Sequence, residues 1–116
     1  DINIISSEQR ITNIQTMVDK YKELSPNSQF FVLSITPIDK NHKWNNGKSG
    51  SSRIEQYNED MKEYCSESDN ITYIDVASSI KDTNGFLDPT FDGGDGLHLD
   101  KTAYFEILDA IIQQTN

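Results

Sequence analysis

The chain of 116 residues is poor in cysteine and has no long hydrophobic run. Its single cysteine, Cys65, can form no disulfide within the chain, and it excludes a zinc site built from several cysteines. We expect Cys65 to be a small, buried apolar residue. Every apolar stretch is far shorter than the roughly 20 residues that cross a bilayer as a helix, so the sequence predicts no membrane span.

Basic residues are scarce as well, with 10 Lys and Arg against 19 Asp and Glu and a net charge of -9. A nucleic acid or an anionic membrane surface would repel such a chain, and no cluster of Lys or Arg offsets the repulsion locally. We therefore expect no nucleic-acid partner. Hydrophobic residues make up only 34% of the chain, yet they recur at regular spacings in four segments, which is typical of one globular domain.

The first third of the chain predicts a helix followed by a strand. Ser6 and Gln9 have the form of a capping box, which predicts a helix over residues 7–24. Its apolar residues recur every three or four positions, at Ile11, Ile14, Val18 and Tyr21. Residues 29–35 are a near-continuous apolar run, which favours a strand buried on both faces in a parallel sheet.

The middle of the chain predicts a long loop and a second helix. Residues 38–51 are polar and aperiodic, and such loops are usually functional when they occur in a compact domain. Ser52 and Glu55 form a second capping box, which places the start of the next helix there. Apolar residues then continue at helical spacing, at Ile54, Tyr57, Met61 and Tyr64 or Cys65.

The last third predicts a strand, a turn-rich segment and a final helix. Residues 71–76 favour a strand, residues 77–80 one helical turn, and residues 82–85 a tight turn. A loop rich in Gly and Asp follows over residues 86–99, and Asp100 is the predicted cap of the last helix. The expected buried face of that helix consists of Tyr104, Ile107, Leu108, Ile111 and Ile112.

Helices and strands alternate along the chain, which predicts a fold of the α/β class. Alternation of this kind indicates right-handed βαβ units in a three-layer α/β/α sandwich with a mostly parallel sheet. Two strands alone make a marginal sheet. We therefore expect the sheet to be completed by self-association or by a missing N-terminal half.

The densest group of chemically active residues is the loop Asp92–His98, directly before the last helix. In open α/β sheets, catalytic groups gather beyond the carboxyl ends of the strands. Asp95 and His98 are three residues apart, so one turn can bring carboxylate and imidazole together as a general base needs. From the spacing alone, the alternative is an aspartate that caps a turn and a histidine that packs at the helix start.

The residues around this pair resemble a known family. Asp95-Gly-Leu-His-Leu99 followed by Lys101–Tyr104 is similar to the final block of the SGNH (GDSL-type) hydrolases. The resemblance spans most of the chain, and the DGLHL block is its specific element. Further similar segments, in the family's order, are Phe30–Pro37 as a strand ending in a Thr-Pro turn, Arg53 with Tyr57-Asn58 in the following helix, and Ile71–Val76 as the next strand.

The resemblance implies a flavodoxin-like α/β/α ester hydrolase that uses a serine nucleophile. His98 would be its general base, Asp95 would orient His98, and no metal or organic cofactor would be needed. The substrate would be an acetylated carbohydrate, a lysophospholipid or a small acyl ester. We expect His42 and Trp44, in the long loop, to contact it; the alternative is an exposed loop histidine and a tryptophan that covers the domain edge.

The chain also departs from the family pattern. It contains no Gly-Asp-Ser nucleophile block, no oxyanion glycine block and no complete Gly-x-Asn-Asp block, of which Asp1 could be the last residue. Residues 1–116 are therefore expected to be a single domain that forms the C-terminal part of an SGNH-hydrolase-like domain. Such a chain alone would be inactive, because its base has no serine to activate.

The absence of a nucleophile block leaves a second hypothesis open. The chain would then be a non-catalytic α/β binding or interaction module. Its loop could hold Ca²⁺, because hard cations prefer several carboxylate oxygens, although the spacing does not match an EF-hand. The candidate ligands are Asp88, Asp92, Asp95 and Asp100.

Overall fold

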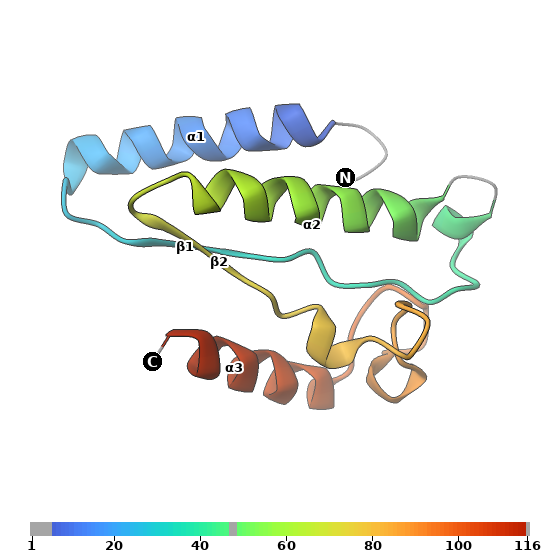
Figure 1. Cartoon of the computed structure of the whole chain (residues 1–116). Coiled ribbons are helices and arrows are strands. Elements are labelled where there is room, and N and C mark those ends of the chain that lie inside the picture. The colour runs from blue at the N-terminus through green and yellow to red at the C-terminus, as the bar shows by residue number, and fades with distance from the viewer. Residues whose placement is uncertain (1–5, 47–48, 116) are drawn as a thin grey trace.

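The computed structural model describes residues 6–46 and 49–115, so Asp1 and the apolar stretch after it lie outside the described residues. Helices and strands alternate as the sequence predicts (Figure 1). In the described part of the chain, no helix is long and apolar enough to span a membrane. The elements are α1 (Ser7–Leu24), β1 (Phe30–Leu33), the 3-10 helix η1 (Lys43–Asn45), α2 (Gly50–Ser66), β2 (Ile71–Ile74), the 3-10 helices η2 (Ser78–Ile80) and η3 (Pro89–Phe91), and α3 (Lys101–Thr115).

The two strands pair in parallel, with Phe30 opposite Ile71 and Leu33 opposite Ile74. Helix α2 connects them, as the crossover of a βαβ unit does. Helices α1 and α2 lie on one side of the sheet and α3 lies on the other (Figure 1). This arrangement confirms the predicted three-layer α/β/α class.

The core on the α1 and α2 side combines residues from both helices and both strands. Val18, Met61, Cys65 and Ile71 form one buried cluster, and Phe30 packs against it. Burying each large apolar side chain contributes about 1.5–3 kcal/mol. Cys65 is 4% exposed and its burial raises the pKa of its thiol, which confirms the expectation of a buried apolar residue.

The core on the α3 side is smaller and centres on the segment between β2 and α3. Ile80, Leu87 and Ala103 are fully buried there. The Asp100 Oδ1 atom accepts hydrogen bonds from the backbone N–H groups of Thr102 at 2.9 Å and Ala103 at 3.2 Å, which confirms the predicted cap of α3. This cap fixes the direction in which the chain leaves the loop before α3.

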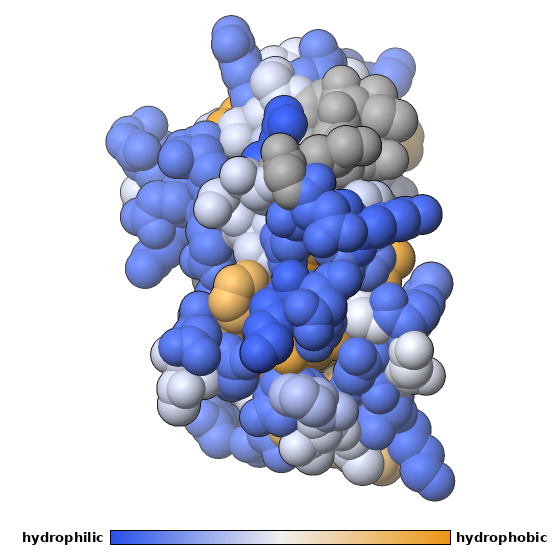
Figure 2. All heavy atoms as spheres, turned by 90° about the vertical axis from the view of Figure 1, so that its right-hand side faces the viewer, coloured by the Kyte–Doolittle hydropathy of each residue, from blue (hydrophilic) through white to orange (hydrophobic). Residues whose placement is uncertain are grey.

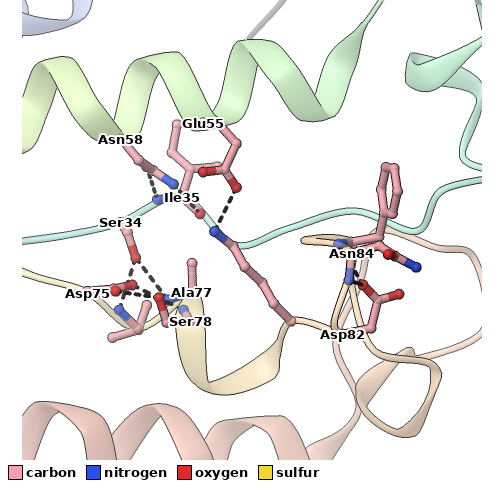
Figure 3. Close-up of polar contacts among 12 residues, drawn as sticks. Ser34, Ile35, Glu55, Asn58, Asp75, Ala77, Ser78, Asp82 and Asn84 are labelled. Carbon is pink, nitrogen blue, oxygen red and sulfur yellow. Dashed lines mark hydrogen bonds and ion pairs between the residues drawn. The ribbon is translucent and has the colours of Figure 1, made fainter.

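Polar contacts hold the carboxyl ends of both strands in place (Figure 3). The buried Ser34 hydroxyl accepts hydrogen bonds from the backbone N–H groups of Val76 and Ala77. The Asn58 amide on α2 both accepts from the N–H of Ile35 and donates to its carbonyl. These bonds satisfy backbone groups where the strand ladder stops.

The predicted start of α2 is wrong. The helix begins at Gly50 rather than at Ser52, and the Ser49 side chain before it makes no capping bond. The acceptor comes instead from η1, because the Asn45 Oδ1 atom accepts from the N–H of Ser51 at 2.7 Å. A Cβ on Gly50 would lie 2.7 Å from the Trp44 carbonyl oxygen, so only glycine fits this close approach.

The prediction that β1 is buried on both faces is also wrong. Phe31 is 55% exposed and Leu33 is 44% exposed, because only one face of β1 is covered by α1 and α2. The expected buried face of α3 is likewise open in part, since a sheet of two strands is too narrow to cover it. Its exposed members are Tyr104, Leu108 and Ile112, and the further exposed apolar residues include Phe105 on α3 and Tyr21 on α1.

Candidate active site

The loop Asp92–His98 is closed at its base by backbone hydrogen bonds. The N–H of Gly93 donates to the His98 carbonyl at 2.7 Å, and the N–H of Asp100 donates to the Phe91 carbonyl at 2.9 Å. Asp92 and Leu99 form an antiparallel bridge between these bonds. The loop therefore leaves and re-enters the fold at one place, between η3 and α3.

Asp95 and His98 face each other within this loop. The Asp95 Oδ2 atom lies 2.5 Å from the His98 Nδ1 atom. The other carboxylate oxygen, Oδ1, accepts from the backbone N–H groups of Leu97 at 2.9 Å and His98 at 2.7 Å. The spacing of three residues thus produces the side-chain pair that the sequence suggested, and the same carboxylate also caps its own turn.

The pair changes the titration of both side chains. The hydrogen bond from the His98 ring, together with the two backbone N–H groups, lowers the pKa of Asp95. The same hydrogen bond and the charge of Asp95 raise the pKa of His98. Both side chains are open to solvent, with 53% of Asp95 and 79% of His98 exposed. Since Nδ1 faces Asp95, the second ring nitrogen, Nε2, is the one left to meet a substrate or a nucleophile.

The loop after β1 contacts the loop Asp92–His98 and helps to hold it in place. The N–H of Asp39 donates to the Gly96 carbonyl at 2.9 Å. Gly96 has a φ of 76°, and a Cβ on it would lie 3.0 Å from the Asp39 Cβ atom. A positive φ and a close neighbour both require glycine here. The loop after β1 and the loop before α3 are therefore in direct contact.

His42 and Trp44 lie in the loop after β1, beside Asp95. His42 is only 9% exposed, so it is not the exposed histidine of the structural alternative. Its Nδ1 atom accepts from the N–H of Trp44 at 3.1 Å, and the two rings meet edge to face with centroids 4.9 Å apart. Together with neighbouring residues they line a hollow of about 440 Å³: Asn41, His42, Lys43, Trp44, Asp95 and Leu97.

Figure 2 shows the side of the molecule at the right of Figure 1, where the loops after β1 and after η2 lie. Hydrophilic residues dominate this face, and apolar residues reach its surface only in small separate patches. The surroundings of the loops are thus suited to a polar or small ligand rather than to a broad apolar one. The exposed apolar residues of β1 and α3 lie outside these two loops.

The carboxylates of the four aspartates in the calcium hypothesis accept hydrogen bonds from backbone N–H groups of their own turns. Each accepts from one or two backbone N–H groups two to four residues further along the chain, as Asp88 does from Thr90 and Asp92 does from Gly94. Among residues 6–46 and 49–115, no group of three or more His, Cys, Asp or Glu side chains is placed to hold a metal ion. The structure therefore gives the calcium loop no support.

Sequence reasoning missed two residues that shape the site. Asp92 accepts from Gly94 and Gly96 within the loop, and Asp39 donates its N–H to Gly96 from outside it. The Asp-x-Gly pattern at residues 92–94 was the available signal for Asp92, because Asp side chains cap turns two residues on. No local signal marks Asp39, whose contact joins distant parts of the chain.

The sequence matches no protein-family model and no curated protein. Solved structures do match. A Streptococcus pneumoniae protein described as a platelet activating factor has a TM-score of 0.82 at 18% identity, over 95% of this chain and 52% of its own. The esterase domain of the zebrafish ZfL2-1 retrotransposon ORF1 protein has a TM-score of 0.73 at 19% identity, over 97% of this chain and 60% of its own.

A GDSL-like lipase from Bacteroides thetaiotaomicron also matches, with a TM-score of 0.71 at 20% identity, over 96% of this chain and 52% of its own. The chain thus has the three-layer α/β fold of GDSL-like lipases and esterases. It spans about half the length of the first of these proteins, 52%. Identities of this size establish a common fold, and the activity has to be argued from the site.

Proposed function

We propose that residues 1–116 are the C-terminal part of an SGNH-type hydrolase domain and carry the base of a serine ester hydrolase. The observation that carries the proposal is the 2.5 Å contact between Asp95 Oδ2 and His98 Nδ1. A carboxylate on Nδ1 orients the imidazole and stabilises the imidazolium that forms when Nε2 takes a proton. The fold shared with GDSL-like lipases and esterases supports this assignment.

In the proposed reaction, His98 moves a proton in both half-reactions. Nε2 takes the proton of a serine hydroxyl as the serine oxygen adds to the ester carbonyl carbon, and it returns that proton to the leaving alcohol as the tetrahedral intermediate collapses. Water then repeats the sequence on the acyl-serine and releases the acid. Asp95 stays ionised throughout, and no metal or organic cofactor takes part.

The serine and the oxyanion donors are proposed to lie outside these residues, since the chain has no Gly-Asp-Ser block. The chain alone is therefore expected to be inactive and to pair with the other half of the domain or with itself. Exposed apolar residues support this, because Phe31 and Leu33 leave one face of β1 open. Exposed apolar surface of this kind marks a site of contact with another protein segment.

The proposed substrate is an acetylated carbohydrate, a lysophospholipid or a small acyl ester. The hollow beside Asp95 supports a polar or small group on one side of the ester, because His42, Lys43 and Trp44 line it. An aromatic ring such as that of Trp44 can stack on a sugar. The hydrophilic face in Figure 2 favours the carbohydrate among these candidates.

The test is ester hydrolysis by the chain joined to the segment that supplies the nucleophile. His98→Ala should lower turnover by a factor of about 10³ or more with unchanged folding, as removal of a triad member does. Glu63→Gln, on the exposed side of α2, is the matched control and should leave turnover unchanged. Turnover that survives His98→Ala would remove His98 from the mechanism and favour the non-catalytic binding module.

A further inference from the structure

Asp92 is a partly buried carboxylate that the proposed mechanism does not use. It lies three residues before Asp95, directly after η3. Its Oδ1 atom accepts two backbone hydrogen bonds, from the N–H of Gly94 at 2.8 Å and from the N–H of Gly96 at 2.9 Å. Hydrogen bonds to a charged acceptor are stronger than neutral ones, so this pair strongly favours one loop conformation.

The two glycines that Asp92 holds are the residues on either side of Asp95. Gly94 has a φ of 122° and Gly96 a φ of 76°, both in the region that L side chains rarely adopt. The backbone therefore reverses before and after Asp95. Without an acceptor for the two N–H groups, Gly94 would lose the side-chain bond that holds its backbone against the many other conformations open to glycine, and Gly96 would keep only its carbonyl bond to Asp39.

Gly96 also connects the loop to the rest of the fold. Its N–H donates to Asp92 while its carbonyl accepts from the N–H of Asp39. Gly96 is buried although its neighbours Asp95 and His98 are exposed. The peptide groups around Gly96 are thus fixed on both sides, and the exposed Asp95 carboxylate extends from this fixed backbone toward His98.

We propose that Asp92 is a positioning residue, which acts through Gly94 and Gly96 to hold the Asp95 carboxylate against the His98 ring. The inference rests on the proposed role of His98 as a base, and it adds the group that pre-organises that base. An exposed ion pair loses side-chain entropy when it forms, so a loop already held in shape makes the contact more favourable. Asp92 itself touches neither substrate nor the reacting atoms.

Two substitutions separate the geometric role of Asp92 from its charge. Asp92→Asn keeps an Oδ1 acceptor for both glycine N–H groups and removes the negative charge. Asp92→Ala removes the acceptor and the charge together. Asp95→Asn provides the reference in which the partner of His98 has lost its charge.

The measurement is an NMR titration of the His98 ring in the 116-residue chain. In the unsubstituted chain, the pKa of His98 should lie above its ordinary value of 6.5. Asp92→Ala should lower it by more than half of the drop that Asp95→Asn causes. Asp92→Asn should leave it close to the original value, as rescue by the conservative variant requires.

Two results would overturn the proposal. One is a pKa of His98 that Asp92→Ala leaves unchanged, and the other is a drop with Asp92→Asn as large as with Asp92→Ala, which would mean that charge acts without the turn. If Asp92→Ala does not fold, a measurement on the unsubstituted chain replaces it. The hydrogen bond from the Gly96 N–H to the Asp92 carboxylate should give a scalar coupling between the Gly96 nitrogen and the Asp92 carboxyl carbon. Its absence would refute the proposal. Ester hydrolysis is not part of this readout, so a failure of the proposed function is seen separately.

Discussion

The two faces of the sheet differ in how completely this chain covers them. On the α1 and α2 face, Val18, Met61 and Cys65 are at most 7% exposed. On the opposite face, Phe31 is 55% exposed and Leu33 is 44% exposed. Both faces have helices with the same apolar periodicity, so the difference lies in what each helix packs against. The chain therefore covers the first face more completely than the second.

The largest expected effect comes from removing a side chain from the covered face. Met61→Ala should lower the free energy of unfolding by about 2–5 kcal/mol, because it removes buried contacts and leaves a cavity. Leu108→Ala, also on a helix but exposed, should change it by less than about 0.5 kcal/mol. Urea unfolding followed by circular dichroism measures both. Equal losses would mean that α3 is covered as fully as α2.

The next prediction concerns association through the exposed apolar residues of α3 and β1. The unsubstituted chain should form dimers or larger species, because large apolar residues on α3 and β1 are open to solvent. Replacing Phe105 and Leu108 together with glutamate should shift the chain toward the monomer. Size-exclusion chromatography with light scattering gives the masses, and Thr16→Glu, at an exposed position of α1, is a control for added charge. A monomer at all concentrations before any substitution would contradict the comparison.

A smaller effect is expected in the loop that carries the site. Gly96→Ala should cost about 1–3 kcal/mol, because a φ of 76° is strained for alanine and the new Cβ would approach Asp39. Gly85→Ala has a φ of 90° but open space around it, so it should cost less. Thermal unfolding of the two variants compares strain alone with strain plus a close contact. Equal costs would show that the Asp39 loop yields freely.

The smallest effect is the dependence of stability on pH. Because the folded pKa of His98 is raised, its contribution is full below 6.5 and is lost as the pH rises through the folded pKa. Because the folded pKa of Asp95 is lowered, its contribution is present above 3.8 and is lost as the pH falls through the folded pKa. The stability that His98→Gln removes should therefore be greatest between these limits. Melting temperatures measured from well below pH 3.8 to well above pH 6.5 would refute the pair if the difference did not change with pH.

Local signals predicted the elements whose stabilising contacts are also local. The Ser6 cap of α1 and the Asp100 cap of α3 are confirmed, because each uses backbone groups within three residues. The start of α2 was missed because its acceptor, Asn45, belongs to another element. Periodicity did not identify the buried face of α3, because three of its five expected members, Tyr104, Leu108 and Ile112, are exposed.

In the candidate site, too, contacts between residues close in the sequence could be predicted and contacts between distant segments could not. The contact between Asp95 and His98 could be predicted because it joins residues three apart in the sequence. Asp92 was missed as a functional residue because an aspartate that caps a turn is common. The burial of His42 could not be predicted, because it depends on packing between the loop after β1 and the loop before α3.

Fluorophosphonate labelling read by intact mass tests the central claim most directly, because the probe bonds only to an activated serine. The account predicts no adduct on the 116-residue chain and one adduct when the segment that supplies the nucleophile is joined to it. That adduct should disappear with His98→Ala and persist with Glu63→Gln. An adduct on the 116-residue chain itself, or one that survives His98→Ala, would contradict the claim that His98 is the base for a serine elsewhere.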